Sequence, residues 1–306
     1  MTDTKIISVA WPLVCSISLL LGGCARKPPV SAHAIRLVST APHLTEIVCA
    51  IGAGDLLAGR TDVCDYPPDQ LASVPVTGGF GTPWLEPLLS VYPTHVLASL
   101  FADPALERRL ATLQVPVLHI PSARLSQIGP AILQVGELTR HRQKAQALAE
   151  RINAGLETAR QAAACLDTRP RVAFLLTPET PITTGRHAFV SELLELAGGI
   201  NIGRDSLHDY YHVSLEWLIL QEPDLIICLF DIPAPEPSAF FATQAGWRTL
   251  KAIRQRRVYT CRELSAVSRP GPRVLEGLAQ LQEILAHDAR LHPSRLPPDT
   301  VNKEPE

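Results

Sequence analysis

The stretch LEPLLSVYP at residues 85–93 recurs in related form as LEWLILQEP at residues 215–223, and this repeat is the strongest indication of the fold. In each, Leu-Glu opens an apolar run of helical character, and a proline follows seven residues after the glutamate. Each stretch then leads into an apolar segment typical of a strand. A unit that recurs 130 residues later predicts two similar halves in one chain, and two facing halves form a cleft.

A second repeated element precedes each of these stretches. It reads TEIVCAIG at residues 45–52 and SELLELAG at residues 191–198, with a glycine six residues after the first glutamate in both. The glycine is a helix-ending signal, and acidic side chains are favourable near helix N-termini. We therefore expect Glu46 and Glu192 to stabilise the N-terminal turns of their own helices, with contact to a docking partner as the alternative.

Short apolar runs alternate with helical patterns on both sides of residue 150, as expected for parallel strands joined by helices. The predicted strands are 35–40, 56–60, 74–76, 96–99, 117–120, 171–176, 182–184, 225–229 and 258–261, and the predicted helices include 85–91, 104–113, 191–197, 215–220 and 272–289. This pattern predicts two Rossmann-like α/β lobes, at residues 34–125 and 167–290, with a ligand cleft between them. Residues 291–306, rich in proline and charge, are expected to form a disordered tail.

Residues 126–166 differ from both lobes because they contain no proline after Pro130 and are dominated by Ala, Gln, Glu, Arg and Leu. A single long α-helix over this segment would span about 60 Å and would join the lobes as a rigid strut. The alternative is two shorter helices with a break near 139–141, which still leaves the connection helical.

The first 24 residues have the pattern of an export signal. A weakly positive start at Lys5 precedes a largely apolar run, interrupted by Pro12, that ends in LGGC at residues 21–24. This ending resembles the lipobox of bacterial lipoproteins, which implies lipidation of Cys24, a linker at 25–33 and a protein tethered in the cell envelope, facing the periplasm. The alternative is an uncleaved membrane anchor. Ala25 lacks the aspartate associated with inner-membrane retention, and the choice between inner and outer membrane stays open.

Composition narrows the classes of function. About 280 residues follow the signal, enough for two domains, and a net charge of −2 indicates no basic surface for nucleic acid. Five cysteines follow Cys24 without CxxC spacing, so a zinc cluster is not expected. Cys228 and Cys261, in predicted strands of the second lobe, either pair as a disulfide or remain buried thiols.

The whole of residues 34–290 resembles the helical-backbone substrate-binding proteins of ABC importers, which carry cobalamin, ferric siderophores and haem. The resemblance rests on segments in a fixed order behind the lipobox: APHLTE at 41–46, CDYPP at 64–68, GGF at 78–80, ITTG at 182–185, LAGGIN at 196–201, WRTL at 247–250, RVY at 257–259 and SRPGPR at 268–273. The vitamin B12-binding proteins are the most similar in these segments. The resemblance implies a monomer that binds a corrinoid, with a ferric-siderophore or haem ligand as the alternative.

The resemblance also implies the partner and its contacts. In this family one glutamate from each lobe forms salt bridges with arginines of the permease, and Glu86 and Glu216 match those positions. Charge-assisted contacts at two lobe tips would both steer and orient docking onto the permease and, through it, its ATPase. The alternatives are that both glutamates only complement the helix dipole, or that the protein scavenges ligand without a dedicated permease.

A large, partly flat ligand needs aromatic and apolar walls with a few hydrogen-bonding groups. Phe80 and Tyr210 match family positions that contact ligand, and five aromatic residues lie close to them in the sequence: Tyr66, Trp84, Phe101, Tyr211 and Phe230. Arg269 and Arg273 are candidates for contacting anionic ligand groups, with a structural role as the alternative for Arg273. Val63 departs from the family, since the best-known members carry there a tyrosine that packs on the corrin.

The sequence leaves two other classes of function open. Binding of a bare transition metal would require convergence of side chains such as His43, His119, His187 and His212. A nucleotide-dependent enzyme is suggested by Gly52 and Gly54, but the segment follows a predicted helix and Leu57 stands where the third glycine of the fingerprint belongs. We therefore expect a binding protein with no cofactor of its own and no catalytic residues.

Overall fold

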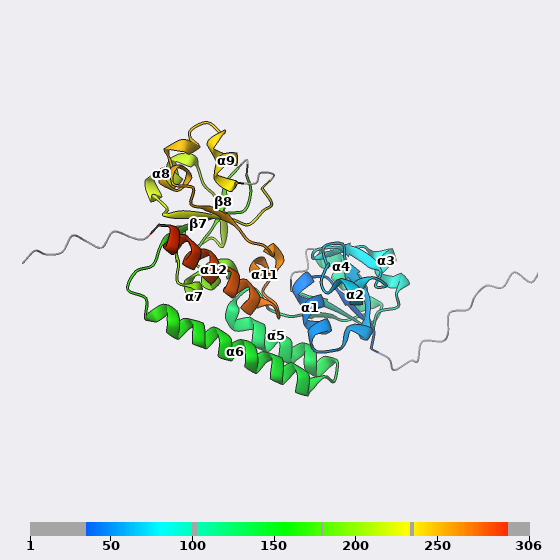
Figure 1. The fold of residues 1–306 in the computed structure, drawn as a ribbon. Helices are drawn as coiled ribbons and strands as arrows, with labels where there is room; N and C mark the ends of the chain where they lie inside the picture. The colour runs from blue at the N-terminus through cyan, green and yellow to red at the C-terminus, as the bar shows by residue number, and fades with distance from the viewer. Residues whose placement is uncertain (1–34, 100–102, 179, 233–235, 293–306) are drawn as a thin grey trace, which may run out of the picture. The chain divides into compact units, whose positions relative to one another are not determined.

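The computed structural model describes residues 35–99, 103–178, 180–232 and 236–292 (Figure 1). The expectations for the signal segment with Cys24, the linker at 25–33, Phe101 and the tail after residue 292 lie outside these residues.

The first lobe is built on a six-stranded sheet with the strand order β4-β3-β2-β1-β5-β6. All neighbouring strands are parallel except β3 and β4, which form a tight antiparallel pair. The strands are β1 Leu37–Ser39, β2 Leu57–Thr61, β3 Val76–Gly79, β4 Thr82–Pro83, β5 His95–Ala98 and β6 Val117–His119. β3 begins two residues later than the sequence indicated. Its pairing with β2 starts at Val76, which lies opposite Arg60.

Helices cover both faces of this sheet because neighbouring residues of each strand point to opposite sides. Leu37 and Leu97 belong to the cluster that includes α1, whereas Val38 and Val96 pack with leucines of α3 and α4. The helices of this lobe are α1 Pro42–Ala50, the single turn η1 Gly54–Leu56, α2 Pro68–Leu71, α3 Leu85–Ser90 and α4 Pro104–Thr112.

The second lobe repeats this arrangement around a parallel sheet with the order β12-β11-β7-β9. A separate antiparallel pair joins β8 to β10. The strands are β7 Arg171–Leu175, β8 Ile182–Thr184, β9 Ile200–Asn201, β10 Tyr210–His212, β11 Leu225–Cys228 and β12 Val258–Thr260. The helices are α7 Phe189–Ala197, α8 Leu215–Gln221, α9 Pro237–Ala242, η2 Trp247–Thr249, α10 Lys251–Arg254, α11 Leu264–Ser268 and α12 Val274–Leu291.

The connection between the lobes is helical, but the prediction of one unbroken helix is wrong. The structure has the two-helix alternative, with α5 Leu125–Leu138 and α6 Arg142–Ala164 packed side by side (Figure 1). Arg140 adopts a left-handed conformation at the break. Each helix has an apolar stripe, with Ile132 on α5 and Ile152 on α6 both fully buried. A straight helix would leave both stripes exposed, so the chain folds back and buries them together.

One apolar cluster extends through both lobes. It includes Leu44 of α1, Ile128 of α5, Ile152 of α6, Leu193 of α7 and Leu281 of α12, all fully buried. The outer faces of the two sheets have separate clusters, one under α3 and α4 and one under α8, α9 and α10. The inner helices therefore tie the lobes together by burial of shared apolar surface.

All five cysteines among the described residues are free thiols, so the structure has the buried-thiol alternative for Cys228 and Cys261. Burial raises the pKa of the Cys261 thiol to about 12 and raises that of Cys228 as well. Neither thiol is therefore a reactive thiolate at neutral pH.

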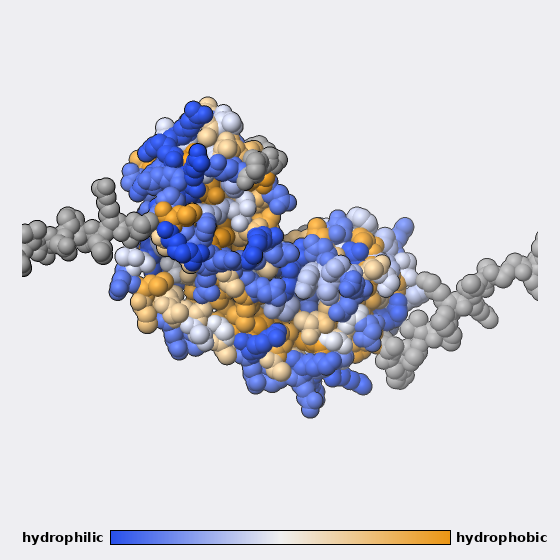
Figure 2. All heavy atoms as spheres, viewed as in Figure 1, coloured by the Kyte–Doolittle hydropathy of each residue, from blue (hydrophilic) through white to orange (hydrophobic). Residues whose placement is uncertain are grey.

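In the part of the chain that the structure describes, no helix combines the length and apolarity that crossing a bilayer requires. The face shown in Figure 2 is mostly hydrophilic, with smaller apolar patches between the charged side chains.

Candidate functional site

The candidate site is a cavity of about 840 Å³ formed where parallel strands end. β1 lies between β2 and β5, so successive connections leave it in opposite directions and open a crevice at the carboxyl ends. Residues that end or follow β1, β2, β3, β5 and β6 all line the cavity, and the second lobe contributes the opposite wall. The lining residues are Pro42, His43, Val63, Phe80, Ser99, His119, Pro121, Ser122, Ala123, Gln127, Tyr210, Ser268, Arg269 and Pro270.

Phe80 and Tyr210 bring aromatic rings to this cavity from the two lobes, and both are about half exposed, at 48% and 49%. Phe80 lies in the turn between β3 and β4. This turn depends on Gly78, since a Cβ there would lie 2.4 Å from the Cα of Pro83. Tyr210 starts β10, which pairs with β8. The structure thus brings these two predicted ligand-contact residues to the same cavity.

The four other aromatic candidates among the described residues lie elsewhere, and none of these four lines this cavity. Tyr211 faces away from Tyr210, as neighbours in a strand do, and its ring meets Trp217 edge-on at 6.1 Å. Phe230 packs against the outer apolar cluster of the second lobe. Trp84 precedes α3 and is 55% exposed. Tyr66 is covered on one ring face by the Arg273 guanidinium, 3.9 Å from its centroid.

Two histidines line the cavity with different surroundings. His43 is buried, and its Nε2 lies 2.7 Å from the Ser122 hydroxyl. Burial, with a smaller contribution from the Arg269 charge, lowers the pKa of His43 to about 4, so its ring is neutral at pH 7. His119 is more exposed, with Nε2 2.8 Å from a Glu107 carboxylate oxygen.

The bare-metal alternative has no geometric support in the described residues. Within them, no three His, Cys, Asp or Glu side chains are grouped so that they would hold a metal ion. His187 and His212 are exposed and do not line the cavity with His43 and His119. As expected from sequence, Gly52 and Gly54 follow α1 rather than the first strand, which is not the position of a nucleotide-binding loop.

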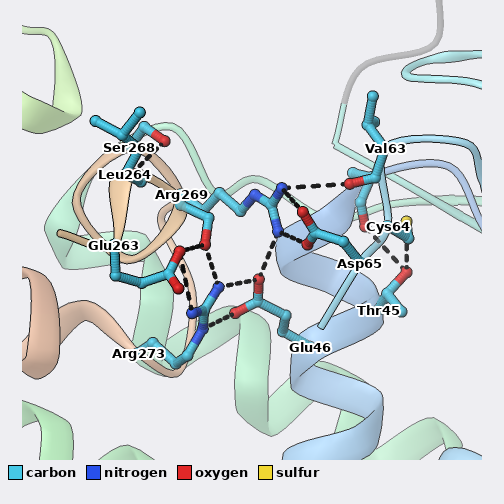
Figure 3. Close-up of polar contacts among 12 residues, drawn as sticks. Thr45, Glu46, Val63, Cys64, Asp65, Glu263, Leu264, Ser268, Arg269 and Arg273 are labelled. Atoms are coloured by element: carbon cyan, nitrogen blue, oxygen red, sulfur yellow. Dashed lines mark hydrogen bonds and ion pairs between the residues drawn. The ribbon is translucent and has the colours of Figure 1, made fainter. Parts of the chain in front are cut away.

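Glu46 does not play the local role that the sequence suggested. Its carboxylate is 2% exposed and accepts hydrogen bonds from Arg273 Nε and Nη2, both at 2.9 Å, and from Arg269 Nη1 at 3.1 Å (Figure 3). Arg269 and Arg273 lie more than 220 residues further along the chain, on either side of the turn before α12. The glutamate therefore joins the first lobe to the second.

Glu192 mirrors this arrangement from the other lobe. It lies in the first turn of α7, but its carboxylate accepts a hydrogen bond from the backbone N–H of Leu125 at 2.8 Å, so it caps α5 rather than its own helix. The same carboxylate borders a second, polar cavity of about 650 Å³ that also contains Arg160, Arg186 and Arg204. The expectation was wrong for Glu46, which lies outside the first turn of α1. Glu192 lies in the first turn of α7 as expected, but its carboxylate also bonds to a distant segment.

Glu86 and Glu216 are exposed in the first turns of α3 and α8. The burial of residues 84–90 and 214–220 alternates identically, with a fully buried leucine two residues after each glutamate, Leu88 and Leu218. Hydrogen bonds from its own backbone N–H and from Ser214 lower the pKa of Glu216. The repeated sequence therefore presents a carboxylate in the same local setting in each lobe.

Sequence reasoning missed much of the cavity wall, including Pro42, Ser99, Pro121, Ser122 and Pro270. Their position in the sequence could have predicted them where their residue type could not, since most of them follow the carboxyl ends of predicted strands. His43 was considered only as a metal ligand, and Val63 only as a departure from the family, although both line the cavity.

Comparisons with known proteins identify the family and the fold. The sequence model described as "Periplasmic binding protein" matches residues 37–264. The chain is 27% identical over 250 residues to a vitamin B12-binding protein of Vibrio parahaemolyticus, which covers 81% of this chain and 88% of the relative. It is also 27% identical over 260 residues to an uncharacterized ABC transporter substrate-binding lipoprotein of Bacillus subtilis. This alignment covers 83% of this chain and 80% of the relative.

Solved structures show the same fold. The periplasmic vitamin B12-binding protein of Vibrio cholerae superposes with a TM-score of 0.69 at 26% identity, covering 83% of this chain and 98% of that one. The periplasmic haem-binding protein of Vibrio cholerae superposes with a TM-score of 0.73 at 21% identity, covering 82% and 99%, and this second likeness bears on the fold alone.

The neutral, buried His43 predicts a pH-dependent stability. The unfolded chain titrates this histidine near pH 6.5, whereas the folded chain does so near pH 4. Between these values the unfolded state binds more protons, so the free energy of unfolding falls as the pH falls, by roughly 2 kcal/mol from pH 7.5 to pH 5. His43→Gln retains a hydrogen-bonding partner for Ser122 but should lack this pH-dependent part of the free energy of unfolding. Urea unfolding of wild type and variant at pH 7.5 and pH 5 measures the difference. An equal pH dependence in wild type and variant would contradict the assignment.

Proposed function

The chain belongs to the periplasmic binding protein family, and we propose that it captures cobalamin or a related corrinoid in the cavity between its lobes and delivers it to a membrane permease. At the level of its family it is an ABC transporter substrate-binding protein of the group that handles vitamin B12, haem and siderophores. Its relatives are binding proteins of transporters rather than enzymes.

The charge of the cavity wall is the observation that favours a corrinoid. Arg269 is the only arginine or lysine among the described lining residues. Both of its terminal nitrogens already donate to Asp65, and they also reach Glu46 and the Val63 carbonyl. A ligand with several negative charges would therefore lack a free cation in this wall. The amide-bearing, nearly neutral periphery of a corrin meets mainly apolar groups, with hydroxyl and amide partners in Ser99, Ser122 and Gln127.

Haem is the second candidate, because His119 and Tyr210 both line the cavity and both residue types bind haem iron. A haem complex would show a Soret band that depends on one of these side chains. The corrinoid complex needs neither as a metal ligand, so the two ligands are separable by direct titration.

Neighbouring tyrosines provide a matched pair for testing the site. Tyr210→Ala should weaken cyanocobalamin binding about tenfold, since a ring–ligand contact contributes roughly 1–2 kcal/mol. Tyr211→Ala should leave the dissociation constant unchanged and instead lower the unfolding temperature, since this ring packs on Trp217. Isothermal titration calorimetry of wild type and both variants, with haemin as the second titrant, measures this.

Failure of the wild-type protein to bind cyanocobalamin would overturn the corrinoid proposal. Binding of haemin with a Soret band lost in Tyr210→Phe or His119→Ala would replace it with haem. Equal weakening by both tyrosine variants would contradict the assignment of the cavity.

We further propose that Glu86 and Glu216 dock the protein onto its permease. They are exposed carboxylates in equivalent positions of the two lobes, and neither forms a salt bridge with another described residue. Both are thus available to guanidinium groups on a partner, and the pair would fix orientation as well as attract. Lipidation of Cys24 stays a prediction from the sequence, and a mature N-terminus other than lipidated Cys24 would refute it.

Reversing both charges separates docking from ligand binding. The variant with Glu86→Lys and Glu216→Lys should retain the wild-type affinity for ligand but lose uptake at least about tenfold, because like charges at an interface cost several kcal/mol. Uptake of labelled cobalamin by cells that express the protein with its permease measures the effect. Glu150→Lys, an exposed glutamate on α6, is the control and should leave uptake unchanged. Normal uptake by the double variant would contradict docking through these residues.

A further inference from the structure

Arg269 lines the cavity, yet its guanidinium is committed to other protein groups. Nη1 donates to Glu46 and to one oxygen of Asp65, and Nη2 donates to the other oxygen of Asp65 at 3.1 Å and to the Val63 carbonyl at 3.3 Å (Figure 3). Its side chain is 18% exposed. The hydrogen bonds from Arg269 are also the main reason why the pKa of Asp65 is lowered. A side chain with this many partners is oriented by the protein rather than poised for a ligand.

Arg273 continues the same network into the interior. It is 6% exposed, forms a two-bond contact with the buried Glu46, and donates through Nη2 to Ser265 at 2.7 Å. The outer face of its guanidinium covers the ring of Tyr66. One carboxylate on α1 thus holds both arginines of the segment that precedes α12.

The backbone between the two arginines lies directly on α1. A Cβ at Gly271 would be 3.2 Å from the Cβ of His43, so this close approach favours glycine. Pro270 and His43 are both in the cavity wall. The segment 268–273 and the start of α1 therefore meet at the cavity itself.

We propose that Arg269, Arg273, Glu46 and Asp65 form an ionic clamp that positions the loop 63–66 and the segment 268–273 as facing walls of the cavity. Arg269 then determines ligand affinity by positioning Val63 and Pro270, and it does not recognise an anionic group on the ligand. The clamp is a property of the folded protein and exists without ligand. The proposal rests on the proposed function only for its binding measurement.

Substitution of Asp65 distinguishes a positioning role of Arg269 from direct recognition of an anionic ligand group. Asp65 is the exposed member of the network, at 63% of its side-chain surface, so Asp65→Asn removes one charge without burying an unpaired one. If Arg269 positions the loop, this variant loosens the wall and weakens every ligand. If Arg269 instead binds an anionic group, the same variant frees the guanidinium and strengthens an anionic ligand such as haemin.

The test combines hydrogen exchange of the ligand-free protein with titrations of neutral cyanocobalamin and anionic haemin. In Asp65→Asn, amide exchange in residues 61–66 should become at least about fivefold faster, as expected for the loss of a charge-assisted contact of about 1 kcal/mol. Any ligand that binds the wild type should bind this variant more weakly, by a similar factor for both ligands. Asp62→Asn, directly before this loop and without a side-chain hydrogen bond or salt bridge to a described residue, is the control and should change neither exchange nor affinity.

A double-mutant cycle completes the test. Asp65→Asn added to Arg269→Ala should have little further effect on exchange or affinity, because the pair is already broken. Unchanged exchange in Asp65→Asn, or tighter haemin binding by it, would overturn the clamp. Failure of the wild type to bind either ligand would refute the proposed function alone, since the exchange measurement needs no ligand.

Discussion

The fold depends on one continuous apolar core that runs from α1 through α5 and α6 to α7 and α12. Each sheet buries its outer face in a cluster of its own, but the inner faces share this core. A rotation of one lobe against the other would have to open it, and each 100 Å² of apolar surface exposed to water costs about 2.5 kcal/mol. The buried faces of the two helices that join the lobes are therefore part of this core. We expect the cavity to keep its width on binding, because a change would expose core surface.

Two carboxylates add directional hydrogen bonds between the halves to this shared apolar core. Glu46 bonds to the arginines before α12, and Glu192 bonds to the backbone at the start of α5. Each glutamate stands in the repeated helix of its own half and reaches the segment that follows the last strand of the other half. This reciprocal arrangement connects the repeated sequence to the packing of the two halves against each other.

The sequence predicts the parts of the fold that depend on local pattern. The strands β8 and β11 and the helices α7 and α8 lie within two residues of their expected bounds, because apolar periodicity, Gly198 and Pro223 mark them. The break at Arg140 was only an alternative, since no glycine or proline marks it and the reason for it is the packing of α5 on α6. The partners of Glu46 lie more than 220 residues away, and no local pattern indicates them. Tyr211 and Phe230 were grouped with Tyr210 by their place in the sequence, which does not reveal the face of the sheet to which each ring points.

We infer that the lobes are held at a fixed separation and that ligand enters a cavity already formed. Small-angle X-ray scattering of the ligand-free protein and of the protein saturated with cyanocobalamin tests this most directly. We expect radii of gyration that agree within about 1 Å, since binding then proceeds by small adjustments of side chains and loops. A contraction of several ångströms on binding would refute a fixed separation, because it would require the shared core and both carboxylate contacts to open and close with each ligand.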